Sequence, residues 1–210
     1  MSAVIELPPM QIHYVEQGTP EWLELRTGVP TASEFAAIMT QGRGGAPSQT
    51  RLTYLYKVIG ERLTGDCSAV FSGNEHTRRG HELEPEARDL YCMLRDTTVR
   101  TVGFISRGKY AGASPDSLVG DDGLLEIKTK LPHLQIPVLL AGKLPEEHRA
   151  QVQGQLWVSE REWCDFLSYW PGLRPFLLRV YRDDDYIEQL ASAVAEFHEQ
   201  LNEIMEKVRA

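Results

Sequence analysis

The segment from Ser114 to Lys128, which reads SPDSLVGDDGLLEIK, restricts the possible folds of this chain more than any other stretch. Its glycine and aspartate cluster, residues 120–123, separates two short apolar runs, and this arrangement predicts a β-hairpin. Strand side chains alternate between the two faces of a sheet, so the length of the turn decides which residues share a face.

Two turn lengths place the polar residues of this hairpin differently. A two-residue loop would put Asp116 opposite Ile127, on the other face from Glu126. A three-residue loop that ends at a left-handed Gly123 would put Asp116 opposite Lys128, with Glu126 on the same face. We predict the three-residue loop.

Asp116, Glu126 and Lys128 on one face would form a metal site. Two neighbouring carboxylates repel each other unless a cation lies between them. Oxygen ligands suit Mg²⁺ or Mn²⁺, and a lysine beside the metal could orient or deprotonate a water that attacks a phosphate. The alternative is a surface hairpin with a solvated Glu-Lys pair, because the E-x-K pattern is common by chance.

Composition favours one soluble globular domain, residues 1–210, with 42% apolar and 25% charged residues. No apolar run approaches the roughly 20 residues of a membrane span, and the N-terminus lacks the pattern of a secretory signal. The three scattered cysteines predict reduced thiols in a cytoplasmic protein. They are Cys67, Cys92 and Cys164.

The net charge of −8 disfavours a protein that coats DNA through its whole surface. Residues 183–210 contain eight acidic and two basic residues, so this segment carries −6 and residues 1–182 carry only −2. The nearly neutral remainder has local basic clusters at Arg78-Arg79, Arg107-Lys109 and Lys128-Lys130. A local groove for DNA is compatible with this distribution.

The remaining pattern predicts one α/β domain, with a mixed sheet of about five strands flanked by helices. Strands are expected at 99–105, in a three-stranded meander with the hairpin, and at 163–169 and 176–182, both centrally buried. Helices are expected at 19–26, from a capping box at 31–34, at 50–63, at 74–95 with a break or kink at Pro85, at 145–158 and at 183–208. Residues 132–144 are expected to be irregular.

Several polar residues outside the hairpin have two interpretations each. Arg26 and Ser33 near a helix N-terminus fit a phosphate site, although an ion pair and a cap are the simpler explanation. Arg43 lies in a glycine-rich segment, residues 41–49, which is either a flexible connector or a basic flap. One of three glutamates at 82, 84 and 86 could supply a further carboxylate, and the sequence does not separate them.

Gln151 and Gln155 stand four residues apart on a predicted helix and therefore share a face. If that face is buried, their amides can position a water or a phosphate near the metal site. If it is exposed, they have no such role.

The motifs taken together resemble the phage lambda-type exonucleases, YqaJ-like viral recombinases of the PD-(D/E)xK nuclease superfamily. The resemblance extends over roughly residues 14–205, in one order and with similar spacings. It includes EQGTPEWLELRTGVPTASE, GHELEPEAR, SPDSLVGDDGLLEIK and AQVQGQLWV. It implies a fold with a restriction-endonuclease-like core.

The resemblance also implies roles for individual residues. Asp116, Glu126, Glu84 and the backbone carbonyl of Ile127 match metal ligands, and Lys128 matches the catalytic lysine. Gln151 matches a glutamine that closes the site. The residues that match a pocket for the DNA 5′-phosphate are Arg26, Ser33 and Ser114.

The family pattern departs from this chain at Leu134, where an arginine is expected six residues after the catalytic lysine. His133 or Lys130 are candidate substitutes for that arginine.

The implied activity is digestion of the 5′-ended strand of linear duplex DNA, in the 5′ to 3′ direction, with two Mg²⁺ ions per site and 3′ overhangs as products. The resemblance further implies a homotrimeric ring and a single-strand annealing protein as partner in recombination. It implies a cytoplasmic location, in the host if the protein is phage-encoded. Two alternatives are an endonuclease of the same superfamily and a non-catalytic protein that binds DNA ends.

Overall fold

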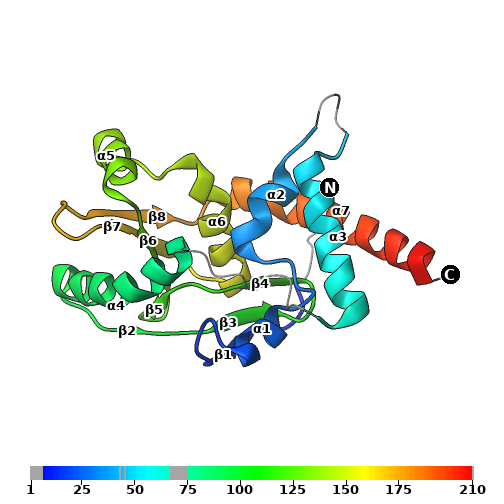
Figure 1. Cartoon of the computed structure of the whole chain (residues 1–210), viewed down its shortest axis with the longest axis horizontal. Helices are drawn as coiled ribbons and strands as arrows, with labels where there is room; N and C mark the ends of the chain where they lie inside the picture. Colours follow the sequence, from blue (N-terminus) through cyan, green and yellow to red (C-terminus); the bar gives the residue numbers. More distant parts are fainter. Residues whose placement is uncertain (1–6, 43, 45, 67–74, 210) are drawn as a thin grey trace.

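The computed structural model describes residues 7–42, 44, 46–66 and 75–209, with the backbone alone at 75–78 and 81. It contains a five-stranded sheet in the order β2-β5-β6-β7-β8 and a three-stranded sheet in the order β1-β3-β4 (Figure 1). The strands are β1 Gln11–His13, β2 Val99–Arg100, β3 Phe104–Arg107, β4 Ala111–Ala113, β5 Ser117–Val119, β6 Gly123–Thr129, β7 Trp163–Tyr169 and β8 Phe176–Tyr181. The helices are α1 Pro20–Arg26, η1 Ala32–Glu34, α2 Phe35–Met39, α3 Gln49–Thr64, α4 Glu75–Arg95, α5 Pro132–Ala141, η4 Glu146–His148, α6 Arg149–Ser159 and α7 Asp184–Arg209.

The larger sheet is mixed, as predicted. Strands β6 and β7 pair in parallel, and the other neighbours in this sheet pair antiparallel. Parallel neighbours need a crossover connection, which here includes α5 and α6. The α/β class with a five-stranded mixed sheet flanked by helices is therefore confirmed.

The hairpin between β5 and β6 has a three-residue loop, but its position differs by one residue from the prediction. Val119 pairs with Gly123, and the left-handed residue is Gly120, with a φ of +54°, instead of Gly123. The register consequently places Asp116 opposite Glu126, not opposite Lys128. The pairing moved by two positions, and an even shift leaves every side chain on its predicted face.

The predicted strand at 99–105 is wrong as one element, and so is the three-stranded meander. Strand β2 pairs with β5 in the larger sheet, whereas β3 pairs with β1 and β4 in the smaller one. Gly103 lies between them, and its N–H donates to the carbonyl of His13 at 3.0 Å. A Cβ atom at this position would lie 2.3 Å from the carbonyl oxygen of Val15, so the close approach requires glycine here.

Two prolines lie in helices: Pro132 in the segment that was predicted to be irregular, and Pro85 without the break that was one of its two predicted effects. Residues 132–141 form α5, with Pro132 in the first turn where no intrahelical N–H is needed, so the predicted irregular segment is wrong. Helix α4 runs through Pro85 over its full length. A proline early in a helix, or one supported by packing, does not end it.

The predicted capping box at 31–34 is also wrong. Thr31 makes no side-chain cap, and a short 3₁₀ helix, η1, precedes α2. The N–H of Thr31 donates instead to the Tyr54 hydroxyl on α3 at 3.0 Å. A tertiary contact thus replaces the local contact that the sequence predicted.

Helices pack on both faces of the larger sheet (Figure 1). Ala87 and Tyr91 of α4 join Leu125 and Ile127 of β6 in one core. The other face packs against α6 and α7, where buried α7 residues are Ile187, Leu190, Val194, Phe197 and Leu201. Strand β7 is buried, but β8 is a half-buried edge strand, so its predicted central position is wrong.

No helix in the described part of the chain is long and apolar enough to cross a membrane. Cys92 and Cys164 carry free thiols, and Cys67 lies outside the described residues.

Candidate active site

A cavity of about 200 Å³ contains most of the polar residues that the sequence singled out. It lies between α1, the β5-β6 hairpin and α6. The lining residues are Gln17, Trp22, Arg26, Ser33, Ser114, Asp116, Glu126, Lys128, Gln151 and Gln155. We call it the central cavity.

Glu126 is the most heavily bonded side chain of the central cavity, and only 2% of its surface is exposed. Oε1 lies 2.6 Å from Lys128 Nζ and accepts from Gln151 Nε2 at 2.7 Å. Oε2 accepts from Gln155 Nε2 at 2.6 Å. The predicted shared face of the two glutamines is therefore confirmed, and it is turned inward.

Asp116 faces Glu126 across the hairpin. Its Oδ2 accepts from the backbone N–H of Ile127, and its own N–H donates to the carbonyl of Leu125 at 3.1 Å. Burial raises the pKa of Asp116 well above its usual value, and the charges of Glu126 and Glu84 raise it further. Carboxylates that repel one another in this way gain free energy when a cation lies between them.

Lys128 lies beside the two carboxylates of the hairpin. Burial lowers the pKa of Lys128, but the charges of Glu126 and Asp116 outweigh burial, and without a metal ion the net pKa lies above its ordinary value. The side chain is therefore an ammonium group in the metal-free site, and the deprotonation of a water by Lys128 beside a bound metal stays a prediction. The ammonium group is suited to donate hydrogen bonds and to orient a water or a phosphate oxygen.

Glu84 is the glutamate of α4 that lies near Asp116, since its charge raises the pKa of Asp116. It lines a second cavity, of about 580 Å³, which shares Gln17 and Asp116 with the central cavity. Glu84 also forms an ion pair with Arg88. Glu86, in contrast, accepts from the Tyr169 hydroxyl, and Glu82 is exposed.

The donors of the central cavity fit a hard divalent cation. Among the described residues, no three carboxylate, imidazole or thiol groups form a complete metal site by themselves. Mg²⁺ does not require one, because it is usually held by one or two carboxylates and keeps several waters. Gln155 Oε1 is buried and has no hydrogen-bond partner within the described chain, so it can accept from a metal-bound water. Asp116, Glu126 and the Ile127 carbonyl, with Glu84 alongside, are the residues that would hold the ion.

The opposite end of the central cavity is suited to an anion. Ser114 Oγ accepts from Arg26 Nη1 at 2.9 Å and from Trp22 Nε1 at 3.1 Å. A hydroxyl oxygen has two lone pairs, so the Ser114 hydroxyl hydrogen remains available to a further acceptor. The guanidinium carbon of Arg26 also lies 4.2 Å from the centre of the Trp22 ring. Arg26, Ser114 and Trp22 form what we call the anion site.

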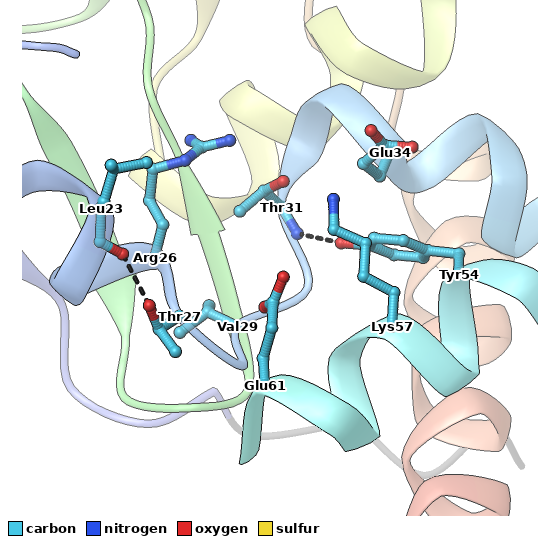
Figure 2. A pocket seen from close by; sticks show the side chains of 9 residues that line it. All are labelled: Leu23, Arg26, Thr27, Val29, Thr31, Glu34, Tyr54, Lys57 and Glu61. Atoms are coloured by element: carbon cyan, nitrogen blue, oxygen red, sulfur yellow. Dashed lines mark hydrogen bonds between the residues drawn. The ribbon is translucent and has the colours of Figure 1, made fainter. Parts of the chain in front are cut away.

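A third cavity, of about 100 Å³, lies on the other side of Arg26 (Figure 2). Glu34 and Glu61 line it together with Tyr54, whose hydroxyl holds the N–H of Thr31. Burial lowers the pKa of Arg26, and the charges of Tyr54, Glu34 and Glu61 partly compensate for it. These charges favour the charged form of Arg26, whose guanidinium bonds to Ser114. Ser33 lies at the exposed rim, with its Oγ 3.2 Å from Thr31 Oγ1.

Four other residues were singled out in the sequence as DNA-binding or phosphate-pocket positions. Arg43 lies outside the described residues. Leu134 is 49% exposed on α5, and His133 beside it is exposed as well. Lys130 Nζ lies 2.6 Å from Glu147 Oε1, so this lysine is engaged in a separate ion pair.

Gln17 and Trp22 are site residues that sequence reasoning does not identify. Trp22 has the pattern of an apolar residue of α1, although its spacing of four from Arg26 predicts contact on a helix. Gln17 Nε2 donates to the carbonyls of Val102 and Pro115, at 3.0 and 3.1 Å. Those partners are about 90 residues away in sequence, so no local pattern indicates the role of Gln17.

Comparison with known proteins gives one family and a close structural relative. The family model of the YqaJ-like viral recombinase domain matches residues 21–162. An alkaline exonuclease from Laribacter hongkongensis, LHK-Exo, is 36% identical, with a TM-score of 0.81 and coverage of 91% of this chain and 96% of that chain. Its complex with dAMP gives a TM-score of 0.82 at the same identity and coverage.

More distant matches support the fold alone or cover only part of the relative. A phage-related exonuclease from Haemophilus somnus is 17% identical, with a TM-score of 0.60 and coverage of 84% of this chain and 96% of that chain. An uncharacterized protein of Acanthamoeba polyphaga mimivirus is 26% identical over 173 residues. That match covers 75% of this chain and 30% of the relative, and the chain spans 30–39% of the length of the curated relatives it matches.

Proposed function

The chain belongs to the YqaJ-like viral recombinase family, and from that premise we propose that it is a metal-dependent exonuclease acting on linear double-stranded DNA. The proposed reaction removes nucleotides from the 5′-ended strand in the 5′ to 3′ direction and leaves 3′ overhangs. Two Mg²⁺ ions, or Mn²⁺, are the proposed cofactors.

The observation that carries this proposal is that the anion site and the carboxylates line one cavity. Ser114 and Asp116 are two residues apart, and two extended residues span at most about 7 Å. A terminal phosphate bound at Ser114 and Arg26 would therefore lie about one nucleotide from a phosphodiester held at Asp116. A binding site for the terminal phosphate, one nucleotide away from the cleaved bond, is suited to an exonuclease. An endonuclease cuts away from chain ends and does not need a site for a terminal phosphate.

Each residue then has a defined part in hydrolysis. When bound, the metal ions stabilise charge on the attacking and leaving oxygens. Lys128 donates a hydrogen bond to the attacking water or to a phosphate oxygen, and Gln151 and Gln155 fix the orientation of Glu126. Water adds to phosphorus, the bond to the 3′-oxygen breaks, and a proton passes to that oxygen.

The products support the choice of the 5′ end. Hydrolysis in this direction releases a nucleoside 5′-monophosphate and leaves a new 5′-phosphate on the shortened strand. The new end is again a ligand for Arg26 and Ser114, so one anion site serves successive cycles. LHK-Exo has been crystallised with dAMP, which belongs to the same chemical class as this product.

The assembly and the partner are proposals from the family resemblance alone. We infer a homotrimeric ring and a single-strand annealing protein that receives the 3′ overhang. Light scattering of the purified chain tests the first inference, because a monomeric mass in solution excludes a ring.

One set of substrates tests the activity. Linear duplex with 5′-phosphate ends should release mononucleotides from its 5′-ended strands in Mg²⁺, more slowly with 5′-hydroxyl ends, and not at all in chelator. Covalently closed circular duplex should remain intact. Cleavage of the circle would favour the endonuclease alternative, and binding of linear ends without any cleavage would favour a non-catalytic end-binding protein.

A further inference from the structure

The second cavity, lined by Glu84 and Asp116, is almost three times the volume of the central cavity, and apart from these two acids its lining has no part in the reaction described above. Its lining combines an aromatic ring, apolar side chains and acids. They are Tyr14, Val15, Glu16, Gln17, Glu84, Pro85, Arg88, Thr101, Val102 and Asp116. Because it shares Asp116 and Gln17 with the central cavity, a strand that passes Asp116 can continue into it.

We propose that this cavity is a subsite for the nucleobase on the 3′ side of the scissile bond, with the ring of Tyr14 as its stacking platform. The proposal rests on the proposed function. With the terminal phosphate at Arg26 and the scissile phosphate at Asp116, the first nucleotide occupies the central cavity. The second nucleotide then lies beyond Asp116, where the second cavity opens.

Tyr14 is presented to solvent by a rigid backbone. Its side chain is 56% exposed, and it lines the second cavity. His13 and Val15, its two neighbours, are both held against Gly103: the carbonyl of His13 accepts from the Gly103 N–H at 3.0 Å, and Val15 leaves no room for a Cβ there. The Arg100 guanidinium lies 5.0 Å from the centre of the Tyr14 ring. These contacts hold the backbone on both sides of Tyr14 and place one cation beside its accessible ring, so little backbone entropy is lost when a base stacks on it.

The charges of the lining favour a base over a phosphate. Glu16, which is not among the proposed metal ligands, repels a phosphate group, and Arg88 is engaged with Glu84 and, at 3.2 Å, with Ser117 Oγ. Gln17 donates both N–H groups of its amide to backbone carbonyls and can offer a ligand only its oxygen, as an acceptor. An aromatic ring can stack on the face of a base. Acceptor oxygens beside the ring can receive hydrogen bonds from an amino group at the edge of that base.

Fluorescence of a base analogue tests the subsite directly. A 5′-phosphorylated duplex carries 2-aminopurine as the second nucleotide from the 5′ end, and a control duplex carries it deep in the double helix. Both are bound to Lys128→Ala protein, in which cleavage is abolished. We expect quenching on binding for the second-nucleotide probe, lost in Tyr14→Ala and retained in Tyr14→Phe, which keeps the ring.

Affinity provides the second readout. Stacking of one base on an aromatic side chain predicts a dissociation constant on the order of tenfold higher for Tyr14→Ala than for Tyr14→Phe. Unchanged quenching and affinity in Tyr14→Ala would overturn the subsite, even if the wild-type chain degrades DNA. Absence of cleavage by the wild type would instead count against the proposed function, while the binding signals remain readable.

Photocrosslinking removes the dependence on any variant. A duplex with 4-thiothymidine as its second nucleotide is irradiated with wild-type protein in chelator, and the crosslinked peptide is identified by mass spectrometry. Attachment within residues 14–17, 84–88 or 101–102 is expected. Attachment confined to any other part of the chain contradicts the proposal.

Discussion

The side-chain amide of Gln155 on α6 donates to Oε2 of Glu126 on β6 at 2.6 Å, with both residues almost fully buried. This contact joins the helix to the strand at the point where the proposed metal ligands meet. The orientation of the Glu126 carboxylate thus depends on a side chain that is not itself a proposed metal ligand.

Gln155→Leu should therefore weaken metal binding without removing any ligand. Loss of a group that orients a metal ligand typically costs about 10- to 100-fold in affinity, so half-maximal activity should need that much more Mg²⁺. Gln153→Leu is the matched control, because Gln153 lies on the same helix, is equally buried, and bonds instead to the Tyr181 carbonyl and the Asp183 N–H. An equal Mg²⁺ requirement in the two variants would contradict the assigned role.

Lys128→Ala should abolish cleavage while leaving duplex binding nearly intact. Its ammonium lies 2.6 Å from Glu126, and a positioned proton donor contributes about 10²- to 10⁴-fold to a rate. Single-turnover cleavage and a filter-binding assay measure the two properties separately. Lys130→Ala, which removes the same charge from an ion pair with Glu147, should retain activity. Normal cleavage by the Lys128 variant would exclude its catalytic assignment.

The preference for a 5′-phosphate should depend on Arg26. Hydrogen bonds to a charged group contribute about 1.5–3 kcal/mol, so Arg26→Ala should reduce the rate ratio of 5′-phosphate to 5′-hydroxyl substrates by about 10- to 100-fold. Trp22→Phe keeps the ring beneath Arg26 but removes the donor to Ser114, and it should reduce the ratio by a smaller factor. Lys57→Ala, at the exposed side of the third cavity, should leave the ratio unchanged (Figure 2).

His148 should make the fold less stable in acid. Burial, together with the charges of Lys128 and Lys130, lowers the pKa of His148 from its ordinary value of 6.5 to about 4. Between these values the unfolded chain binds a proton that the folded chain does not, so the free energy of unfolding falls as the pH falls from 6.5 to about 4. The loss from this residue is at most about 3 kcal/mol.

Urea denaturation across this pH range measures the effect. His148→Gln should flatten the decline in unfolding free energy relative to the wild type. His133→Gln, which removes an exposed histidine from α5, should follow the wild-type curve. Parallel slopes for all three proteins would show that His148 does not titrate in this way.

Local chemistry in the sequence was sufficient for much of the site. The turn composition and the alternation of strand side chains predicted that Asp116 and Glu126 share a face, and a register error of two positions did not change that result. The spacing of four predicted that Gln151 and Gln155 act together. The family motifs selected Glu84 from three neighbouring glutamates, and the structure places it beside Asp116.

Long-range contacts account for what the sequence missed. Residues 99–107 divide between two sheets because Val15 packs against Gly103, and Thr31 is held by Tyr54 of α3 instead of by its own helix. No local sequence pattern predicts either contact, since each joins segments that are far apart in the chain.

The sequence by itself therefore indicated the α/β class, the hairpin, and the carboxylates and glutamines that line the central cavity, because turns, periodicity and motif spacing are local properties. Only the tertiary structure decided the protonation of Lys128 and the bonding of Ser114. Burial and the approach of Glu126 set the first, and Trp22 and Arg26 set the second. Electrostatics and hydrogen bonding depend on distances in space, and the order of residues does not specify those distances.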